Sequence, residues 1–325
     1  MLEDKTSQVL ILTKRTYVPE TEYTNYAPFI QFEYKPTERL VLQAGVRDEH
    51  AKLDVNTYQT VAANNSVTVN GGSPSFHETV YNAGAVFKIT PIVSVFANYS
   101  QGFGMPDVGR VLRGVSTTGQ DVDTLIDLSP IVTDNYEVGL RVNRHPYDIE
   151  VSYYESNSDL GSRIVENNGL YIVKREKKEI QGAEASLGYQ LNKEHKLQAS
   201  YSYIQGKSDA DGDGKVETRL TGADISPNRL VASWNATWNE KLSSLLQVSH
   251  AFDRSFDDED LNFDGYTLVD ASIGYSLPIG KMNVSVANLL NEDYFTYYSQ
   301  AAYANDSFYF KGRGRTVTLA YGLDF

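Results

Sequence analysis

The chain has 325 residues, more than most single compact domains, and no cysteine, which excludes disulfides, thiolate metal sites and thiol catalysis. Its 42 acidic and 29 basic residues give a net charge of −13, so the chain's own field would repel a nucleic acid. With 23 Tyr, 24 Gly and a mean hydropathy of −0.39, the composition favours strands and turns over membrane helices or disorder.

No segment approaches the roughly 18 apolar residues that a spanning helix needs, and the first fifteen residues lack a signal-peptide pattern. A membrane strand needs only about 9 to 11 residues with every second one apolar, so a hydrophilic average is compatible with a barrel. We therefore expect any secretion signal to have been cleaved or to lie outside this sequence.

Along the chain, short connections alternate with long polar ones. The short ones contain Pro, Gly, Asn or charge clusters, as hairpin turns do: 35–40, 89–91, 143–148, 190–196, 238–241 and 278–281. The long ones are rich in Asn, Asp, Gly, Ser and Tyr: 55–76, 101–132, 156–173, 206–226, 252–265 and 292–311. This asymmetry is typical of outer-membrane barrels, which have tight periplasmic turns and large external loops. It predicts about fourteen strands, with both chain ends on the short-turn rim.

The strands alternate between an apolar and a polar side. In the strand at 230–238, one side carries Leu230, Ala232, Trp234, Ala236 and Trp238, and the other carries Val231, Ser233, Asn235 and Thr237. A soluble sandwich would also alternate. Because no helical segment of useful length could cover the apolar side, and Trp and Tyr cluster near strand ends, a membrane barrel is favoured. The sequence predicts an all-β fold, a transmembrane antiparallel up-and-down β-barrel, as one domain over residues 1–325.

Several segments, in order, resemble the TonB-dependent receptors: YSQGFGMPDVGRVLRG (99–114), TDNYEVGLR (133–141), EIQGAEASLGYQL (179–191), ISPNRL (225–230), VANLLNEDYF (286–295) and GRGRTVTLAYGLDF (312–325). Among these receptors, SQGFGMPDVGR with SYIQGKSDADGDG most resembles those for citrate-hydroxamate siderophores of the aerobactin type. The final strand, with Tyr321, Leu323 and Phe325, is similar to the terminal signal that the barrel assembly machinery reads.

The resemblance implies a ferric-siderophore receptor of the bacterial outer membrane, with iron carried only as chelated cargo. Family members have a barrel of twenty-two strands around an amino-terminal plug, through which the TonB complex energises transport. Nothing in this sequence resembles the plug, so the resemblance implies the carboxy-terminal portion of such a barrel.

No residues form a recognisable catalytic set. His145 and His195 fall in short turns, while His50, His77 and His250 lack the i, i+4 or HxH spacing of metal ligands. No serine lies in a nucleophile-elbow context. The sequence therefore predicts that the chain is not an enzyme and carries no cofactor.

One acidic loop partly matches a calcium-binding pattern. Asp209, Asp211 and Asp213 followed by Gly214 fit the start of an EF-hand loop, with Glu217 at its ninth position. The twelfth position, where a bidentate Glu should stand, is leucine, and no flanking helices are expected. A hydrated external loop is favoured over an ion site.

The predicted external loops carry arginines and aromatic residues that suit an anionic ferric siderophore. Guanidinium groups would hold its carboxylates while rings cover its apolar parts. The candidate ligand-binding residues are Arg110, Arg113, Arg163, Tyr297, Tyr298 and Tyr303. Aromatic loops are also common at membrane interfaces and between packed loops, so a structural role is favoured over ligand contact for each of these residues. Two other functions remain open, a passive porin-like channel and a soluble β-rich adhesin.

Overall fold

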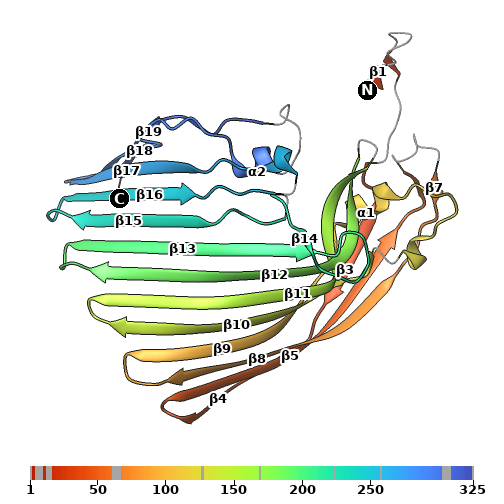
Figure 1. Ribbon diagram of the computed structural model, residues 1–325, viewed down its shortest axis with the longest axis horizontal. Coiled ribbons are helices and arrows are strands. Elements are labelled where there is room, and N and C mark those ends of the chain that lie inside the picture. The colour runs from red at the N-terminus through yellow and green to blue at the C-terminus, as the bar shows by residue number, and fades with distance from the viewer. Residues whose placement is uncertain are drawn as a thin grey trace.

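The computed structural model describes residues 2–3, 10–11, 17–60, 67–125, 128–167, 170–222, 224–256, 258–301 and 309–323. Its main feature is one antiparallel sheet of 15 strands that curves like part of a barrel wall (Figure 1). The bounds of its long strands are β3 (Thr21–Tyr26), β4 (Phe29–Thr37), β5 (Leu40–Val55), β8 (Ser75–Lys88), β9 (Val93–Gly104), β10 (Ile131–Arg144), β11 (Tyr147–Asn167), β12 (Leu170–Gln190), β13 (His195–Ser208), β15 (Arg229–Thr237), β16 (Leu242–Ala251), β17 (Tyr266–Leu277), β18 (Gly280–Ala287) and β19 (Thr316–Gly322).

Small elements complete the described structure. They are β1 (Leu2–Glu3), β2 (Leu10–Ile11), β6 (Tyr58–Gln59), β7 (Thr68–Val69), β14 (Thr218–Arg219), α1 (Val108–Gly114), α2 (Tyr297–Ala301), η2 (Val122–Thr124) and η4 (Glu259–Leu261). Apart from the separate β1–β2 pair, these elements belong to the connections between long strands. Within the described ranges, no helix is long and apolar enough to cross a membrane.

The strands occupy thirteen successive positions in the sheet, in chain order from β3 to β19. β3 and β4 share one position because both pair with β5, on either side of Pro28. Thr21 of β3 pairs with Val55, at the long-loop end of β5, so the first position begins at the long-loop rim. The prediction that both chain ends lie on the short-turn rim was therefore wrong.

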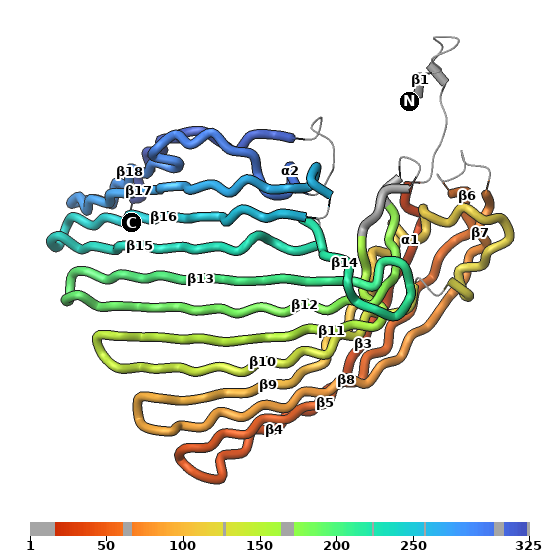
Figure 2. The backbone as a smooth tube through the Cα atoms, viewed as in Figure 1, coloured from red at the N-terminus to blue at the C-terminus, as the bar shows by residue number. Residues whose placement is uncertain are grey.

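The asymmetry between the two rims is confirmed. The six short turns all lie at one rim, at the left of Figure 2, and the longer connections gather at the other. One predicted loop was wrong, because residues 156–173 lie mostly in the hairpin of β11 and β12. Each of these strands has 21 residues, about 70 Å at 3.3 Å per residue, far more than a bilayer requires. The hairpin therefore extends well beyond the band that could lie in lipid.

The apolar side of the sheet is exposed. Trp238 is 50% exposed, Ile273 55% and Leu319 68%, and within the described residues no second sheet or helix packs on this side. Most of the buried apolar residues instead form two clusters at the long-loop rim. A water-soluble protein would bury this side, so the arrangement is that of a sheet whose apolar face contacts lipid.

Aromatic side chains border the apolar face near both ends of the strands. On β11, Tyr147 and Tyr153 point to this face six residues apart, about 20 Å along the strand. Tyr201 and Tyr203 lie toward the long-loop end of β13, and Trp234 and Trp238 lie toward the short-turn end of β15 and the turn after it. These two belts match the girdles that lie at lipid headgroups in transmembrane barrels.

The sheet has two open margins. β19 pairs only with β18, and β3 and β4 pair only with β5, so among the described strands the first and last positions do not meet. We call these strands the two margins. The described residues therefore form part of a barrel wall rather than a closed barrel.

Candidate functional site

The long-loop rim holds the first apolar cluster, which joins several connections. It contains Leu53, Val55, Tyr58, Val67, Val69, Val111, Leu112, Val115, Val122, Leu128 and Val173. The Tyr58 hydroxyl donates to the Leu112 carbonyl at 2.5 Å, and burial raises the pKa of this phenol. The Thr60 hydroxyl donates to the carbonyl of Arg113 at 2.7 Å. These bonds fix the β5–β8 connection against α1.

Helix α1 places two of the candidate arginines in different environments. Asp107 caps the helix by accepting the backbone N–H of Arg110 at 3.0 Å, and its other carboxylate oxygen lies 3.4 Å from the Arg110 guanidinium. Arg113 is only 5% exposed, and its guanidinium lies 4.4 Å from the ring centroid of Tyr17. Arg110 is thus the better placed of the two to reach a ligand, although ligand contact by either residue stays a prediction.

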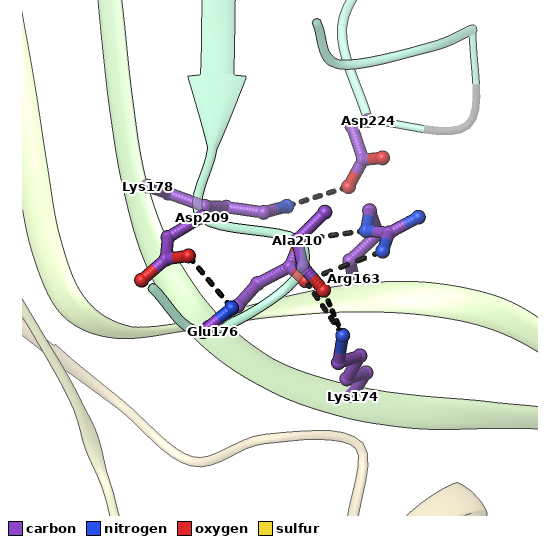
Figure 3. A network of polar contacts seen from close by, with 8 residues as sticks. Arg163, Lys174, Glu176, Lys178, Asp209, Ala210 and Asp224 are labelled. Atoms are coloured by element: carbon purple, nitrogen blue, oxygen red, sulfur yellow. Dashed lines mark hydrogen bonds and ion pairs between the residues drawn. The ribbon is translucent and has the colours of Figure 1, made fainter. Parts of the chain in front are cut away.

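The third candidate, Arg163, belongs to a network of ion pairs in the outer part of the β11–β12 hairpin, near the tip (Figure 3). Its Nε donates to Glu176 at 2.6 Å, and the side chain of Glu176 is 2% exposed. Lys174 lies 4.0 Å from the same carboxylate. Because a buried carboxylate already pairs with it, Arg163 has a structural role whether or not it also touches a ligand.

A second ion pair lies beside this network. Lys178 donates to the Asp224 carboxylate at 2.6 Å, although the two residues are 46 positions apart, and both side chains are largely buried. The segment KREKKE at 174–179 was not singled out from sequence. The sequence signal for this network was the spacing of its charged residues. Lys174, Glu176 and Lys178 occupy alternate positions and therefore share one face of β12.

The second apolar cluster, formed by Ala251, Phe256, Phe263, Tyr297 and Ala301, contains one candidate tyrosine. Tyr297 of α2 is 9% exposed, and its ring packs edge-on against Phe263 with centroids 4.8 Å apart. Burial raises the pKa of Tyr297. The neighbouring Tyr298 is 52% exposed and so can reach a ligand, while Tyr303 lies outside the described residues. Tyr297 is thus buried and Tyr298 exposed, just as Arg113 of α1 is buried and Arg110 is accessible.

The acidic loop brings its three aspartates together. Their carboxylate oxygens lie within 4.8 Å of one another, but Glu217 is not part of this group. Asp209 accepts the backbone N–H groups of Gly212 and Gly214 at 2.8 and 3.0 Å, as in a self-contained turn. Lys215 donates to Asp213 and lowers the pKa of that carboxyl. These bonds account for the arrangement without an ion, and the hydrated loop that the sequence favours over a calcium site stays a prediction.

Below the rim, the polar side of the sheet carries a hydrophilic cavity. Among the residues that line it are Glu150, Ser152, Glu184, Ser200, Ser202 and Arg229. Nearby, Arg141 donates twice to Glu150, at 2.8 and 3.0 Å. A wall of hydroxyl, carboxylate and guanidinium groups can line a path for a charged, hydrated solute.

The predicted assembly signal lies at the margin formed by β19. Tyr321 and Leu323 are each 49% exposed, and the Tyr321 hydroxyl donates to the Ile279 carbonyl at 2.7 Å. Phe325 lies outside the described residues. The two described side chains are on the apolar face, as the sequence predicts.

Curated relatives are similar in sequence to this chain over most of its length. It is 27% identical to the ferric aerobactin receptor of Klebsiella pneumoniae, over 94% of this chain and 45% of the receptor. It is 26% identical to the rhizobactin receptor of Rhizobium meliloti, over 93% of this chain and 43% of that receptor. The chain therefore spans less than half the length of these relatives.

Solved structures share the fold. The copper transporter OprC aligns with a TM-score of 0.77 at 17% identity, covering 97% of this chain and 50% of the transporter. The unliganded ferric citrate transporter FecA aligns with a TM-score of 0.69 at 16% identity, covering 94% of this chain and 45% of that protein. The family model described as "TonB dependent receptor-like, beta-barrel" matches residues 4–291. With this match over most of its length, the chain belongs to the TonB-dependent receptor-like β-barrel family.

Proposed function

We propose that the chain is the barrel portion of a bacterial outer-membrane receptor that imports a ferric siderophore. The observation that carries the proposal is the similarity to a ferric aerobactin receptor over 94% of the chain. The exposed apolar face of the sheet and the cavity on its polar side agree with this function. The ligand class proposed is a citrate-hydroxamate siderophore, an anion at neutral pH. Iron is cargo held by the siderophore and is not ligated by the protein.

The proposed mechanism begins at the loop rim. Arg110 and Tyr298, both accessible, contact the ferric complex, while the pairs Arg163–Glu176 and Lys178–Asp224 hold the hairpin beneath it. A charged complex then leaves the rim along the polar wall rather than through lipid. As in other members of the family, the TonB complex would energise transport through a plug, and the barrel assembly machinery would read the β19 end.

Two rival functions make different predictions. A soluble adhesin is disfavoured because the apolar face of the described sheet is uncovered. A passive porin would also have a polar wall, but it would give a steady conductance in planar bilayers and would not bind a ferric siderophore with saturation. No enzymatic role is proposed, since the family is one of transport receptors.

Equilibrium binding of a radiolabelled ferric citrate-hydroxamate siderophore to the detergent-solubilised chain tests the proposal. We expect saturable binding, and about 10-fold weaker binding by Arg110→Ala, because a hydrogen bond to a charged group contributes about 1.5–3 kcal/mol. Arg144→Ala, at the short-turn end of β10, is the matched control and should bind like the unmodified chain. Absence of saturable binding, or equal affinity for a ferric catecholate, would contradict the proposed ligand class.

A further inference from the structure

Two histidines and an aspartate meet on the apolar face at the long-loop end of β5 and β8, away from the polar cavity. Asp48 and His50 are on β5, and His77 is on β8. The β5–β8 register places His50 directly opposite His77, and Asp48 opposite Thr79. Val46 and Tyr81, the next pair on the same face, belong to the apolar band. The three side chains therefore lie just beyond that band, level with the lipid headgroups.

Both imidazole rings present their Nε2 atoms to the same carboxylate. His50 Nε2 lies 2.8 Å from Asp48 Oδ2, and His77 Nε2 lies 2.7 Å from Oδ1. The two rings are stacked, with centroids 4.5 Å apart and an interplanar angle of 21°. Three potential ligand atoms of the kinds that bind transition metals thus lie within 4.8 Å of one another.

Neighbouring side chains hold these groups in place. Tyr26 of β3 stacks on His50 with centroids 4.6 Å apart and an interplanar angle of 7°. The Thr79 hydroxyl donates to Asp48 Oδ1 at 2.8 Å. In metal sites, second-layer hydrogen bonds of this kind orient the ligands. The cluster is therefore organised by residues from three strand positions, and the side chain of His77 remains 59% exposed to an incoming ion.

We propose that Asp48, His50 and His77 form a binding site for one divalent transition-metal ion of the zinc class. His50 Nε2, His77 Nε2 and one Asp48 oxygen would be the protein ligands, and water or a lipid-headgroup phosphate oxygen would take the fourth position. Imidazole nitrogen with a single carboxylate suits zinc, copper or nickel, whereas calcium and magnesium prefer sites made of oxygen alone.

Metal binding requires a small rearrangement. Ligand atoms around a tetrahedral zinc ion are about 3.4 Å apart when bond lengths are about 2.1 Å. Both Nε2 atoms must therefore come to lie about 3.4 Å from the same Asp48 oxygen, whereas they now contact different oxygens at 2.8 and 2.7 Å, and side-chain rotations can provide this shift. Each ring must carry its proton on Nδ1, and an imidazolium must first release a proton to the solvent. The ion then replaces the two hydrogen bonds that hold the cluster together without metal.

This site is separate from the proposed import function. It lies on the face that contacts lipid, whereas the siderophore would contact the loop rim and the polar wall. A metal ion bound here would link two strands near a margin of the sheet to anionic headgroups. Loss of the metal site would leave siderophore binding unchanged, so the two proposals can fail independently.

Zinc titration of the untagged full chain in detergent, against a chromophoric chelator at neutral pH, tests the site. We expect one ion per chain, with affinity reduced at least about 100-fold in His77→Ala and about 10-fold in Thr79→Val. The matched control is His250→Ala, since His250 also faces the apolar side near the rim but contacts Thr267 and Phe252 instead of a carboxylate. This variant should retain full affinity.

The proposal is overturned if the unmodified chain binds no stoichiometric zinc, or if His77→Ala binds as tightly as His250→Ala. Circular dichroism establishes whether each variant is folded. If His77→Ala does not fold, X-ray absorption at the zinc edge of the unmodified chain tests the site by counting the imidazole ligands of the bound ion. Two imidazole ligands are expected there, and fewer than two would refute the site.

Discussion

Replacing Val248 with arginine is expected to weaken insertion of the sheet into a bilayer by about 2–4 kcal/mol. Val248 lies on the apolar face of β16 between the two aromatic belts, opposite Ala232 and Val269. An arginine there would place a charge near the centre of the lipid, where it has no water to solvate it. The measurement is the fraction of chain folded into phosphatidylcholine vesicles across a urea titration.

The adjacent residue provides the matched control. Gln247 points to the opposite, polar side, next to Ser233 and Asp270, so Gln247→Arg adds the same charge in a hydrated environment. We expect it to change insertion by less than about 0.5 kcal/mol. Equal losses in the two variants would mean that the apolar face packs against protein, which would contradict both the membrane barrel and the import function.

The Arg163→Met variant is expected to destabilise the β11–β12 hairpin by about 3 kcal/mol, because it leaves the Glu176 carboxylate buried without its closest cation. The loss should appear as faster trypsin cleavage within KREKK at 174–178, at a urea concentration that leaves the unmodified hairpin intact. Adding Glu176→Gln should restore most of the protection, since the buried charge is then removed.

The exposed pair Arg141–Glu150 is the control for this experiment. Its side chains are 43% and 40% exposed, so Arg141→Met should cost less than about 1 kcal/mol. If Arg163→Met and Arg141→Met behave alike, the hairpin does not depend on the buried pair. The structural role assigned to Arg163 would then be wrong, and ligand contact would remain as the role proposed for this residue.

The strands could be predicted from sequence wherever one side meets an apolar environment. Leu230, Ala232 and Trp234 occupy alternate positions and were placed correctly on one side of the sheet, as were the six short turns. The β11–β12 hairpin was missed because its outer part meets solvent and the buried ion pairs of the long-loop rim instead of lipid, so no alternation of apolar and polar residues marks it. The register shift between Ser158 and Gly161 further obscures the pattern.

The candidate site was less predictable because its contacts join distant segments. Sequence identified Arg110, Arg113 and Arg163 by residue type, but not that Arg113 is buried or that Arg163 pairs with Glu176. Similarly, His50 and His77 are 27 positions apart, and only the register of β5 against β8 brings them together. Spacing rules for metal ligands along one strand cannot detect a pair formed across two strands.

The two margins impose a condition on biogenesis. Each presents a row of backbone N–H and C=O groups with no partner among the described strands, and hydrocarbon offers such groups no substitute for water. Entry of this sheet into lipid must therefore be concerted with the docking of further strands beside β19 and beside β3 and β4. A half-inserted intermediate would be short-lived unless another protein covered the unpaired backbone groups of both margins until the barrel closed.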